Sequence, residues 1–219
     1  MTVNQLSSVP KPRLRSCSVG EVRYSVRRKR GILSICRAVR SSPRRISTVF
    51  IDRDGVLNRR VMGGYVTRWS EFEIMPGVST FLRQLRSLNC QLVIVSNQAA
   101  VAKGLLSWQE LANMTLMSFE AFQVPGGIDG AFFCLHQSSD GCSCRKPRTG
   151  LLEEAARRLD ISFEHSFFIG DSRTDIFAGS AMGCKTVYLS KDADATVHPT
   201  VVASTPREAA LWIGRELKT

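Results

Sequence analysis

The sequence has no apolar run that could form a membrane-spanning helix. Such a helix needs ~20 consecutive apolar residues. The strongest candidate, residues 31–39, is far shorter and is interrupted by Arg37. The remaining composition, with 43% hydrophobic and 22% charged residues, is that of an ordinary globular protein. We therefore expect a protein without a membrane partner.

Cysteine is also too sparse and too unevenly placed for a disulfide framework. There are seven cysteines, an odd number, and three of them cluster with a histidine. Cys134-x-His136 and Cys142-x-Cys144 supply four ligands and leave no position open for substrate, which is typical of a structural zinc site. The alternative is a set of free thiols beside a chance histidine. The zinc reading implies a reducing compartment, so we expect a cytoplasmic protein.

Acidic residues are nearly absent from the first 45 residues. This arm holds 12 of the 30 Lys and Arg but one of the 19 Asp and Glu, namely Glu21. The remainder then carries 18 of each, so the net charge of +11 belongs to the arm and the body is neutral. We expect residues 1–47 to be a disordered basic extension and residues 48–219 to be the folded domain, a monomer. A transit-like segment or a mis-assigned start are the alternatives for the arm.

From Thr48 onward, apolar runs typical of buried strands alternate with amphipathic stretches. Ser107 and Glu110 form the pattern of a helix capping box. Such alternation predicts an α/β fold, a Rossmann-like parallel sheet with helices on both faces. Strands are expected at 48–51, 91–95, 130–133, 166–169 and 185–189, and helices at 78–88, 107–123, 150–159, 176–182 and 206–217.

The pair Asp52 and Asp54 follows the first of these strands directly. Two carboxylates at the end of a buried strand are costly unless a cation or a substrate uses them. One carboxylate can attack phosphorus, and the other can protonate the leaving oxygen and then activate water. Taken alone, Asp-x-Asp-Gly is also compatible with a calcium-like loop or a solvated turn.

Three further polar clusters follow strands of the same expected sheet. Ser96-Asn97 can donate hydrogen bonds to phosphate oxygens, Arg145-Lys146 can neutralise phosphoryl charge, and Asp171 suits a hard cation such as Mg²⁺. Each cluster alone is weak, since such residues commonly form turns or helix caps. Ligands of parallel sheets bind beyond the carboxyl ends of the strands, so we expect the clusters to meet there.

The order and spacing of these clusters resemble the haloacid dehalogenase (HAD) superfamily. Within it, DRDGVLN at 52–58, GYV at 64–66, SNQ at 96–98, CRKP at 144–147 and GDSRTD at 170–175 resemble the histidinol-phosphatase and D,D-heptose 1,7-bisphosphate 7-phosphatase subgroup. This resemblance implies a phosphatase without a large cap domain, with Asp52 as nucleophile and Asp54 as general acid and base. It further implies phosphate contacts from Ser96, Asn97, Arg145 and Lys146, Mg²⁺ on Asp52, Asp54 and Asp171, and Zn²⁺ on Cys134, His136, Cys142 and Cys144.

The substrate class implied by this resemblance is a small phosphorylated metabolite. The pattern around Gly64-Tyr65-Val66 favours the heptose bisphosphate, whereas the short spacing between His136 and Cys142 favours histidinol phosphate. A DNA 3′-phosphatase and a non-catalytic nucleic-acid-binding protein are further alternatives, since the arm is basic. The neutral body and the missing aromatic platform argue against nucleic acid as a partner.

Overall fold

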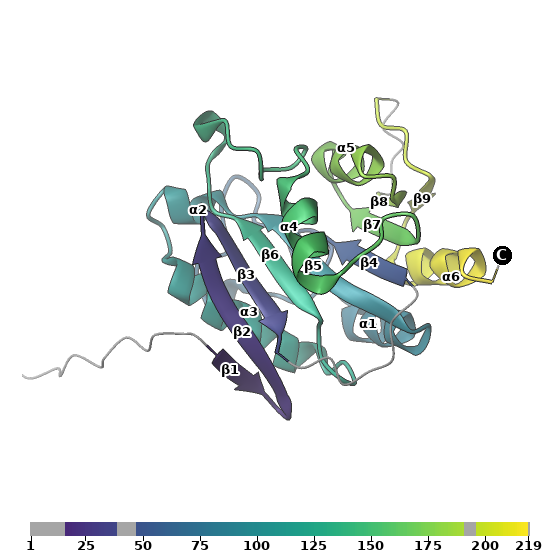
Figure 1. Cartoon of the computed structure of the whole chain (residues 1–219), viewed down its shortest axis with the longest axis horizontal. Coiled ribbons are helices and arrows are strands. Elements are labelled where there is room, and N and C mark those ends of the chain that lie inside the picture. Colours follow the sequence, from purple (N-terminus) through teal and green to yellow (C-terminus); the bar gives the residue numbers. More distant parts are fainter. Residues whose placement is uncertain (1–15, 39–46, 191–195, 219) are drawn as a thin grey trace, which may run out of the picture.

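The computed structural model describes residues 16–38, 47–190 and 196–218. Across these residues, nine strands form one sheet in the order β1-β2-β3-β6-β5-β4-β7-β8-β9 (Figure 1). The six neighbouring strands β6-β5-β4-β7-β8-β9 are parallel, whereas the pairs β1-β2, β2-β3 and β3-β6 are antiparallel. The strands are β1 Ser16–Val19, β2 Val22–Lys29, β3 Ile32–Arg37, β4 Ser47–Ile51, β5 Cys90–Asn97, β6 Gly130–Cys134, β7 Ser166–Gly170, β8 Lys185–Leu189 and β9 Val201–Ala203.

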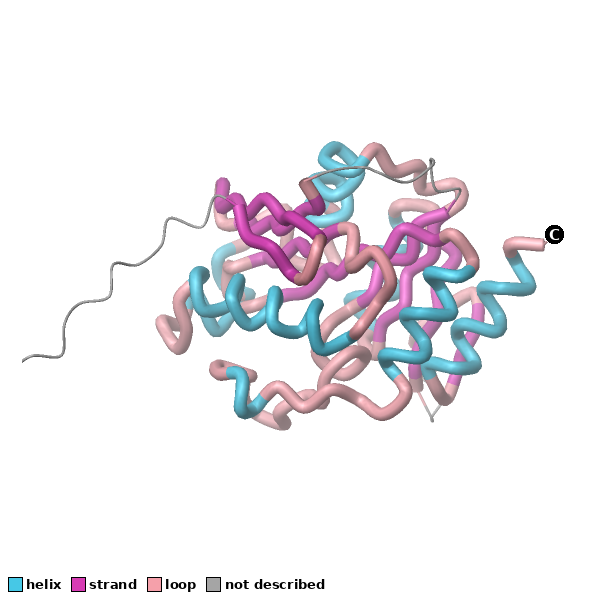
Figure 2. Tube along the Cα trace, turned by 90° about the horizontal axis from the view of Figure 1, so that it is seen from below, coloured by secondary structure: helices cyan, strands magenta, loops and turns pink. Residues whose placement is uncertain are grey.

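The central strands are apolar on both faces because helices cover both sides of the sheet. Every residue of β4, β6 and β7 is buried, as a doubly covered parallel sheet requires. Helices lie on either side of the strands in Figure 2. They are α1 Val78–Ser87, α2 Ala99–Ala102, α3 Trp108–Phe122, α4 Gly150–Leu159, α5 Arg173–Ala181 and α6 Pro206–Glu216. The predicted α/β fold is confirmed.

Two hydrophobic clusters, one on each face, join the helices to the sheet. The larger contains Phe81 of α1, Phe119 of α3 and Ile213 of α6. The smaller contains Leu152 of α4 and Ala178 of α5. The predicted capping box at the start of α3 is present, with reciprocal bonds between Ser107 and Glu110.

The expected disorder of residues 1–47 is wrong for residues 16–37, which form β1, β2 and β3. Strand β3 pairs with β6 and extends the sheet. Leu33 and Ile35 of β3 are fully buried, whereas along β2 the buried Tyr24 and Val26 alternate with the more exposed Arg23, Ser25 and Arg27. This alternation along β2 is typical of a strand that has one buried and one solvent-exposed face. The rest of that arm, residues 1–15 and 39–46, lies outside the described residues.

The connection from β4 to α1 carries no cap domain. Its described residues contain only the short 3₁₀ helix η1, Trp69–Glu71, so loops shape the adjoining edge of the sheet. Among the residues that the structure describes, no helix is both long and apolar enough to cross a membrane.

Candidate active site

Four strands bring the predicted polar clusters to one edge of the sheet. Asp52 follows β4, Ser96 and Asn97 close β5, Cys134 closes β6 and Asp171 follows β7. Because β4–β7 are parallel neighbours, their carboxyl ends meet. A pocket of about 270 Å³ opens there, and its lining includes Asp52, Asp54, Ser96, Asn97, Arg145 and Lys146.

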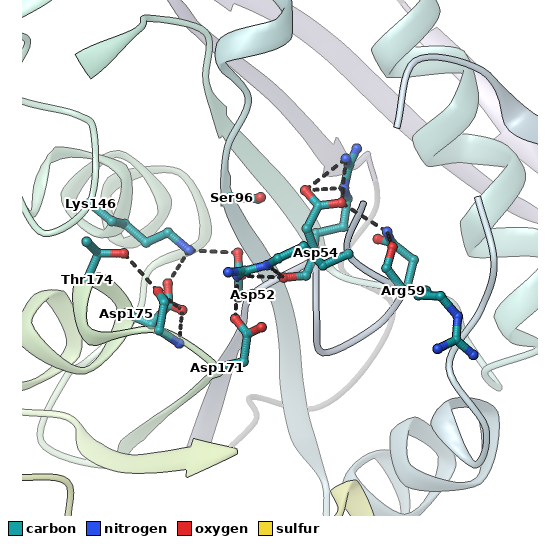
Figure 3. Close-up of polar contacts among 12 residues, drawn as sticks. Asp52, Asp54, Arg59, Ser96, Lys146, Asp171, Thr174 and Asp175 are labelled. Carbon is teal, nitrogen blue, oxygen red and sulfur yellow. Dashed lines mark hydrogen bonds and ion pairs between the residues drawn. The ribbon is translucent and has the colours of Figure 1, made fainter. Parts of the chain in front are cut away.

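The ammonium group of Lys146 lies buried at the centre of this pocket. Its Nζ is 2.8 Å from Oδ1 of Asp52 and 2.6 Å from Oδ1 of Asp175 (Figure 3). It also donates to the carbonyl oxygen of Val95 at 2.8 Å. Burial alone would lower the pKa of Lys146, but Asp175 and Asp52 raise that pKa above its usual range. Lys146 is therefore a fixed positive charge beside the Asp52 carboxylate.

Three carboxylates converge around this single lysine. One oxygen each of Asp52, Asp171 and Asp175 lies within 4.8 Å of the others. Burial, reinforced by the neighbouring Asp175, raises the pKa of Asp52. Burial also raises the pKa of Asp171 to about 6. Such an excess of buried negative charge favours binding of a cation, and the hard oxygen donors suit Mg²⁺.

Arg60 supplies part of the missing positive charge. Its Nη2 donates to Oδ1 of Asp171 at 2.7 Å and to the carbonyl oxygen of Asp54 at 3.0 Å. Asp171 and Asp54 are two of the three residues that the family resemblance assigns to Mg²⁺. Gly55 allows the carboxylate to approach, since a Cβ at this position would lie 1.8 Å from Oδ2 of Asp171.

The side chain of Asp54 accepts hydrogen bonds from three neighbouring side chains. Nη2 of Arg53 lies 2.8 Å and Nδ2 of Asn58 lies 2.9 Å from its Oδ1, and Nε2 of Gln98 lies 2.7 Å from its Oδ2. Burial opposes ionisation, but Arg53, Asn58 and Gln98 outweigh it and lower the pKa of Asp54. Gln98 also donates to Oγ of Ser96 at 3.1 Å, which links the two predicted site residues.

Asn97 and Arg145 shape the segment that carries Lys146. The Asn97 amide accepts a hydrogen bond from the Lys146 backbone N–H and donates to its carbonyl oxygen, both at 3.0 Å. Arg145 donates to the carbonyl oxygen of His136 at 3.1 Å and also lines the pocket. Both polar ends of the Asn97 amide are thus engaged in positioning Lys146.

The predicted zinc ligands form a compact cluster beside this segment. Sγ of Cys144 lies 3.3 Å from Sγ of Cys134 and 3.6 Å from Sγ of Cys142. Nδ1 of His136 lies 3.3 Å from Sγ of Cys144 and 3.6 Å from Sγ of Cys134. A tetrahedron with ordinary Zn–S and Zn–N bond lengths has edges of roughly 3.5–3.8 Å, so these residues fit the ion.

Known proteins with the same sequence pattern decide the family. A HAD-hydrolase-like family model matches residues 143–209. The D-glycero-beta-D-manno-heptose-1,7-bisphosphate 7-phosphatase of Helicobacter pylori strain J99 is 30% identical over 168 residues, 75% of this chain and 95% of the relative. This chain belongs to the heptose bisphosphate phosphatase family of HAD-like hydrolases.

Further relatives agree with this family. The D-glycero-alpha-D-manno-heptose-1,7-bisphosphate 7-phosphatase of Mycobacterium tuberculosis H37Rv is 37% identical over 150 residues, 64% of this chain and 78% of the relative. The crystal structure of D,D-heptose 1,7-bisphosphate phosphatase from B. bronchiseptica, complexed with magnesium and phosphate, matches with a TM-score of 0.71. It shares 27% sequence identity, and the match covers 78% of this chain and 99% of that chain.

Two residues at this family site have contacts that the sequence analysis did not predict. Gln98, part of the SNQ motif at 96–98, is buried and donates hydrogen bonds to Asp54 and Ser96. Arg60 lies outside every motif that the sequence analysis names, although its guanidinium reaches Asp171. Arg59 pairs with Glu73, whereas Arg60 pairs with Asp171. The sequence does not show which of these two adjacent arginines points toward the pocket.

Proposed function

We propose that this protein is a magnesium-dependent phosphatase that removes the 7-phosphate of D-glycero-D-manno-heptose 1,7-bisphosphate. The observation that carries the proposal is the buried Lys146 ammonium held between Asp52 and Asp175. Such a charge is suited to a dianionic phosphoryl group that approaches Asp52. The relatives from Helicobacter pylori and Mycobacterium tuberculosis, both named as heptose bisphosphate phosphatases, support the choice of substrate.

In the first half-reaction, a carboxylate oxygen of Asp52 attacks phosphorus and forms an aspartyl-phosphate. The bond from phosphorus to the C7 oxygen of the sugar breaks, and protonated Asp54 gives its proton to that oxygen. Asp54 is ionised before substrate binds, because its pKa is lowered. The negative charge of an incoming phosphate group opposes that ionisation, so Asp54 takes up a proton from solvent as the substrate binds.

In the second half-reaction, Asp54 accepts a proton from water. The resulting hydroxide attacks phosphorus, the bond to the Asp52 oxygen breaks, and inorganic phosphate leaves with Asp52 restored. Lys146 and Ser96 hold the phosphoryl oxygens through both steps, and Asn97 holds the backbone of Lys146 in place.

Two metal ions belong to this proposal. The carboxylates of Asp52 and Asp171 and the carbonyl oxygen of Asp54 would hold Mg²⁺, which supplies charge neutralisation at the phosphoryl group. Cys134, His136, Cys142 and Cys144 would hold Zn²⁺ and fix the loop that leads into Arg145 and Lys146. The monomeric state and the cytoplasmic location stay predictions.

Kinetics over a matched panel test the substrate assignment. The panel holds heptose 1,7-bisphosphate, histidinol phosphate and a 3′-phosphorylated DNA oligonucleotide, each assayed for released phosphate. We expect kcat/KM for the heptose bisphosphate to exceed the others by roughly 100-fold, or ~2.7 kcal/mol. A preference for histidinol phosphate, which the short spacing between His136 and Cys142 favours, or for DNA would contradict the assignment.

A further inference from the structure

The hairpin of β2 and β3 reaches the zinc cluster through its turn. In the register of β3 against β6, Ile32 lies opposite Cys134, a zinc ligand of the proposed site. Gly31 then precedes Ile32, and its carbonyl oxygen accepts a hydrogen bond from the backbone N–H of Leu135 at 2.9 Å. The turn is therefore bonded to the segment between Cys134 and His136.

The shape of this turn requires glycine at its second position. Lys29 pairs with Ile32, so Arg30 and Gly31 form a two-residue hairpin turn. Their φ angles are 49° and 70°, both in the left-handed region that such turns need. An added Cβ at Gly31 would lie 2.1 Å from Cε1 and 2.2 Å from Nε2 of His136.

The contact falls on the side of the imidazole that faces away from the sulfurs. Nδ1 of His136 lies 3.3 Å from Sγ of Cys144 and 3.6 Å from Sγ of Cys134, whereas Cε1 and Nε2 lie nearest to the position that a Cβ at Gly31 would occupy. The turn thus limits rotation of the His136 ring and its movement away from the three sulfurs. Groups outside the ligand set that orient a metal-binding histidine raise metal affinity, commonly 10–100-fold.

We propose that the Arg30-Gly31 turn is a positioning part of the zinc centre. It holds Nδ1 of His136 toward the three thiolates and thereby raises the affinity of the site for Zn²⁺. The inference rests on the proposed zinc site and is independent of the substrate. It gives the N-terminal hairpin a task at a cluster that lies about one hundred residues later in the chain.

Two alanine variants separate this contact from general backbone strain. Gly31→Ala adds a methyl group against His136, and Gly20→Ala adds one in the turn between β1 and β2. Gly20 also has a positive φ, 55°, but nothing lies within 4 Å of an added Cβ. Zinc affinity is measured by competition with a chromophoric chelator. We expect Gly31→Ala to weaken zinc binding about tenfold or more and Gly20→Ala to change it less than twofold.

A change at His136 shows whether the effect passes through the imidazole. His136→Cys keeps four zinc ligands, a set common in structural sites, and removes the ring that the methyl group would strike. In this background we expect Gly31→Ala to leave zinc affinity within twofold. A similar loss in both backgrounds, or equal affinities of Gly31→Ala and Gly20→Ala, would overturn the positioning role. A parent protein that binds no zinc would instead refute the zinc site itself.

Discussion

At the scale of single residues, Asp175 combines two tasks around Lys146. Its Oδ2 accepts hydrogen bonds from the backbone N–H and the hydroxyl of Ser172 and so caps α5, while its Oδ1 pairs with Lys146. The residue that caps α5 therefore also holds the ammonium group of Lys146 beside Asp52. The site depends on α5 for the position of the lysine as well as on the loop that carries it.

The acid role of Asp54 is open to a test at this scale. Asp54→Asn removes the proton donor and the ion pair with Arg53 but keeps a side chain of the same size. We expect turnover of an alkyl phosphate to fall roughly 10²–10⁴-fold, since that leaving oxygen needs a proton. An aryl phosphate, whose leaving group is a weak base, should lose far less. Steady-state kinetics with both substrates measures this, and equal losses would refute the assignment.

Arg60 should compete with the proposed magnesium ion. Its guanidinium bonds Asp171 and the carbonyl oxygen of Asp54, and its side chain is 44% exposed. A pair this exposed contributes up to ~1 kcal/mol, so Arg60→Ala should tighten Mg²⁺ binding up to about fivefold in calorimetric titrations. Arg59→Ala is the matched control, because Arg59 pairs with the exposed Glu73. Weaker binding in Arg60→Ala, or the same change in Arg59→Ala, would contradict this role.

The sequence could predict those site residues whose motif gives both the residue type and its position at the end of a strand. Asp52, Lys146 and Asp171 meet at one edge of the sheet, and the four predicted zinc ligands lie close together. The roles of Arg60 and Gln98 could not be predicted. Each depends on the direction of a long side chain across the pocket, which only the folded loops determine.

At the scale of elements, the loop between β6 and α4 that carries the predicted zinc ligands is rich in polar residues and short of apolar ones. In isolated zinc fingers the metal contributes ~10–16 kcal/mol to folding, so the ion should dominate the order of this loop. We expect about one zinc per chain by metal analysis of protein purified without chelator, and loss of that zinc in Cys142→Ser. Cys17→Ser, in strand β1, serves as control and should keep it. Zinc-free parent protein, or retention in Cys142→Ser, would contradict the assignment.

The N-terminal hairpin should be part of the folding unit. Tyr24, Leu33 and Ile35 are fully buried, and each such side chain contributes ~1.5–3 kcal/mol. Their loss would take much of a total stability of ~5–15 kcal/mol and would leave the edge of β6 unpaired. A chain that begins at residue 39 should therefore unfold at a much lower temperature than one that begins at Ser16. Equal melting temperatures for the two chains would show that the hairpin is dispensable.

This expectation reverses the one drawn from sequence, and the reason lies in β2. The consecutive cations Arg27, Arg28, Lys29 and Arg30 read as a solvated charged run. The alternation of Val22, Tyr24 and Val26 before them, and the Arg30-Gly31 turn after them, are the signals of a hairpin. The parallel strands were predictable because burial on both faces leaves unbroken apolar runs. In a strand with one solvent-exposed face, charged residues interrupt the apolar ones, so the strand is harder to recognise in the sequence.

At the scale of the whole molecule, the basic excess of the arm falls partly on a folded surface. Arg27, Arg28, Lys29 and Arg30 are exposed on the hairpin that packs beside the proposed zinc site. The catalytic edge itself is open, since no cap domain follows β4. Recognition of the proposed substrate must come from the loops at this edge, whose conformation the sequence could not predict.

Phosphorus NMR of the reaction with D-glycero-D-manno-heptose 1,7-bisphosphate tests the central claim most directly. With Mg²⁺ present, we predict loss of the C7 phosphate signal, growth of inorganic phosphate and an intact C1 phosphate. Asp52→Asn, which cannot form the aspartyl-phosphate, should leave the spectrum unchanged while it keeps the fold. Release of the C1 phosphate, no reaction in the parent protein, or turnover by Asp52→Asn would contradict the account.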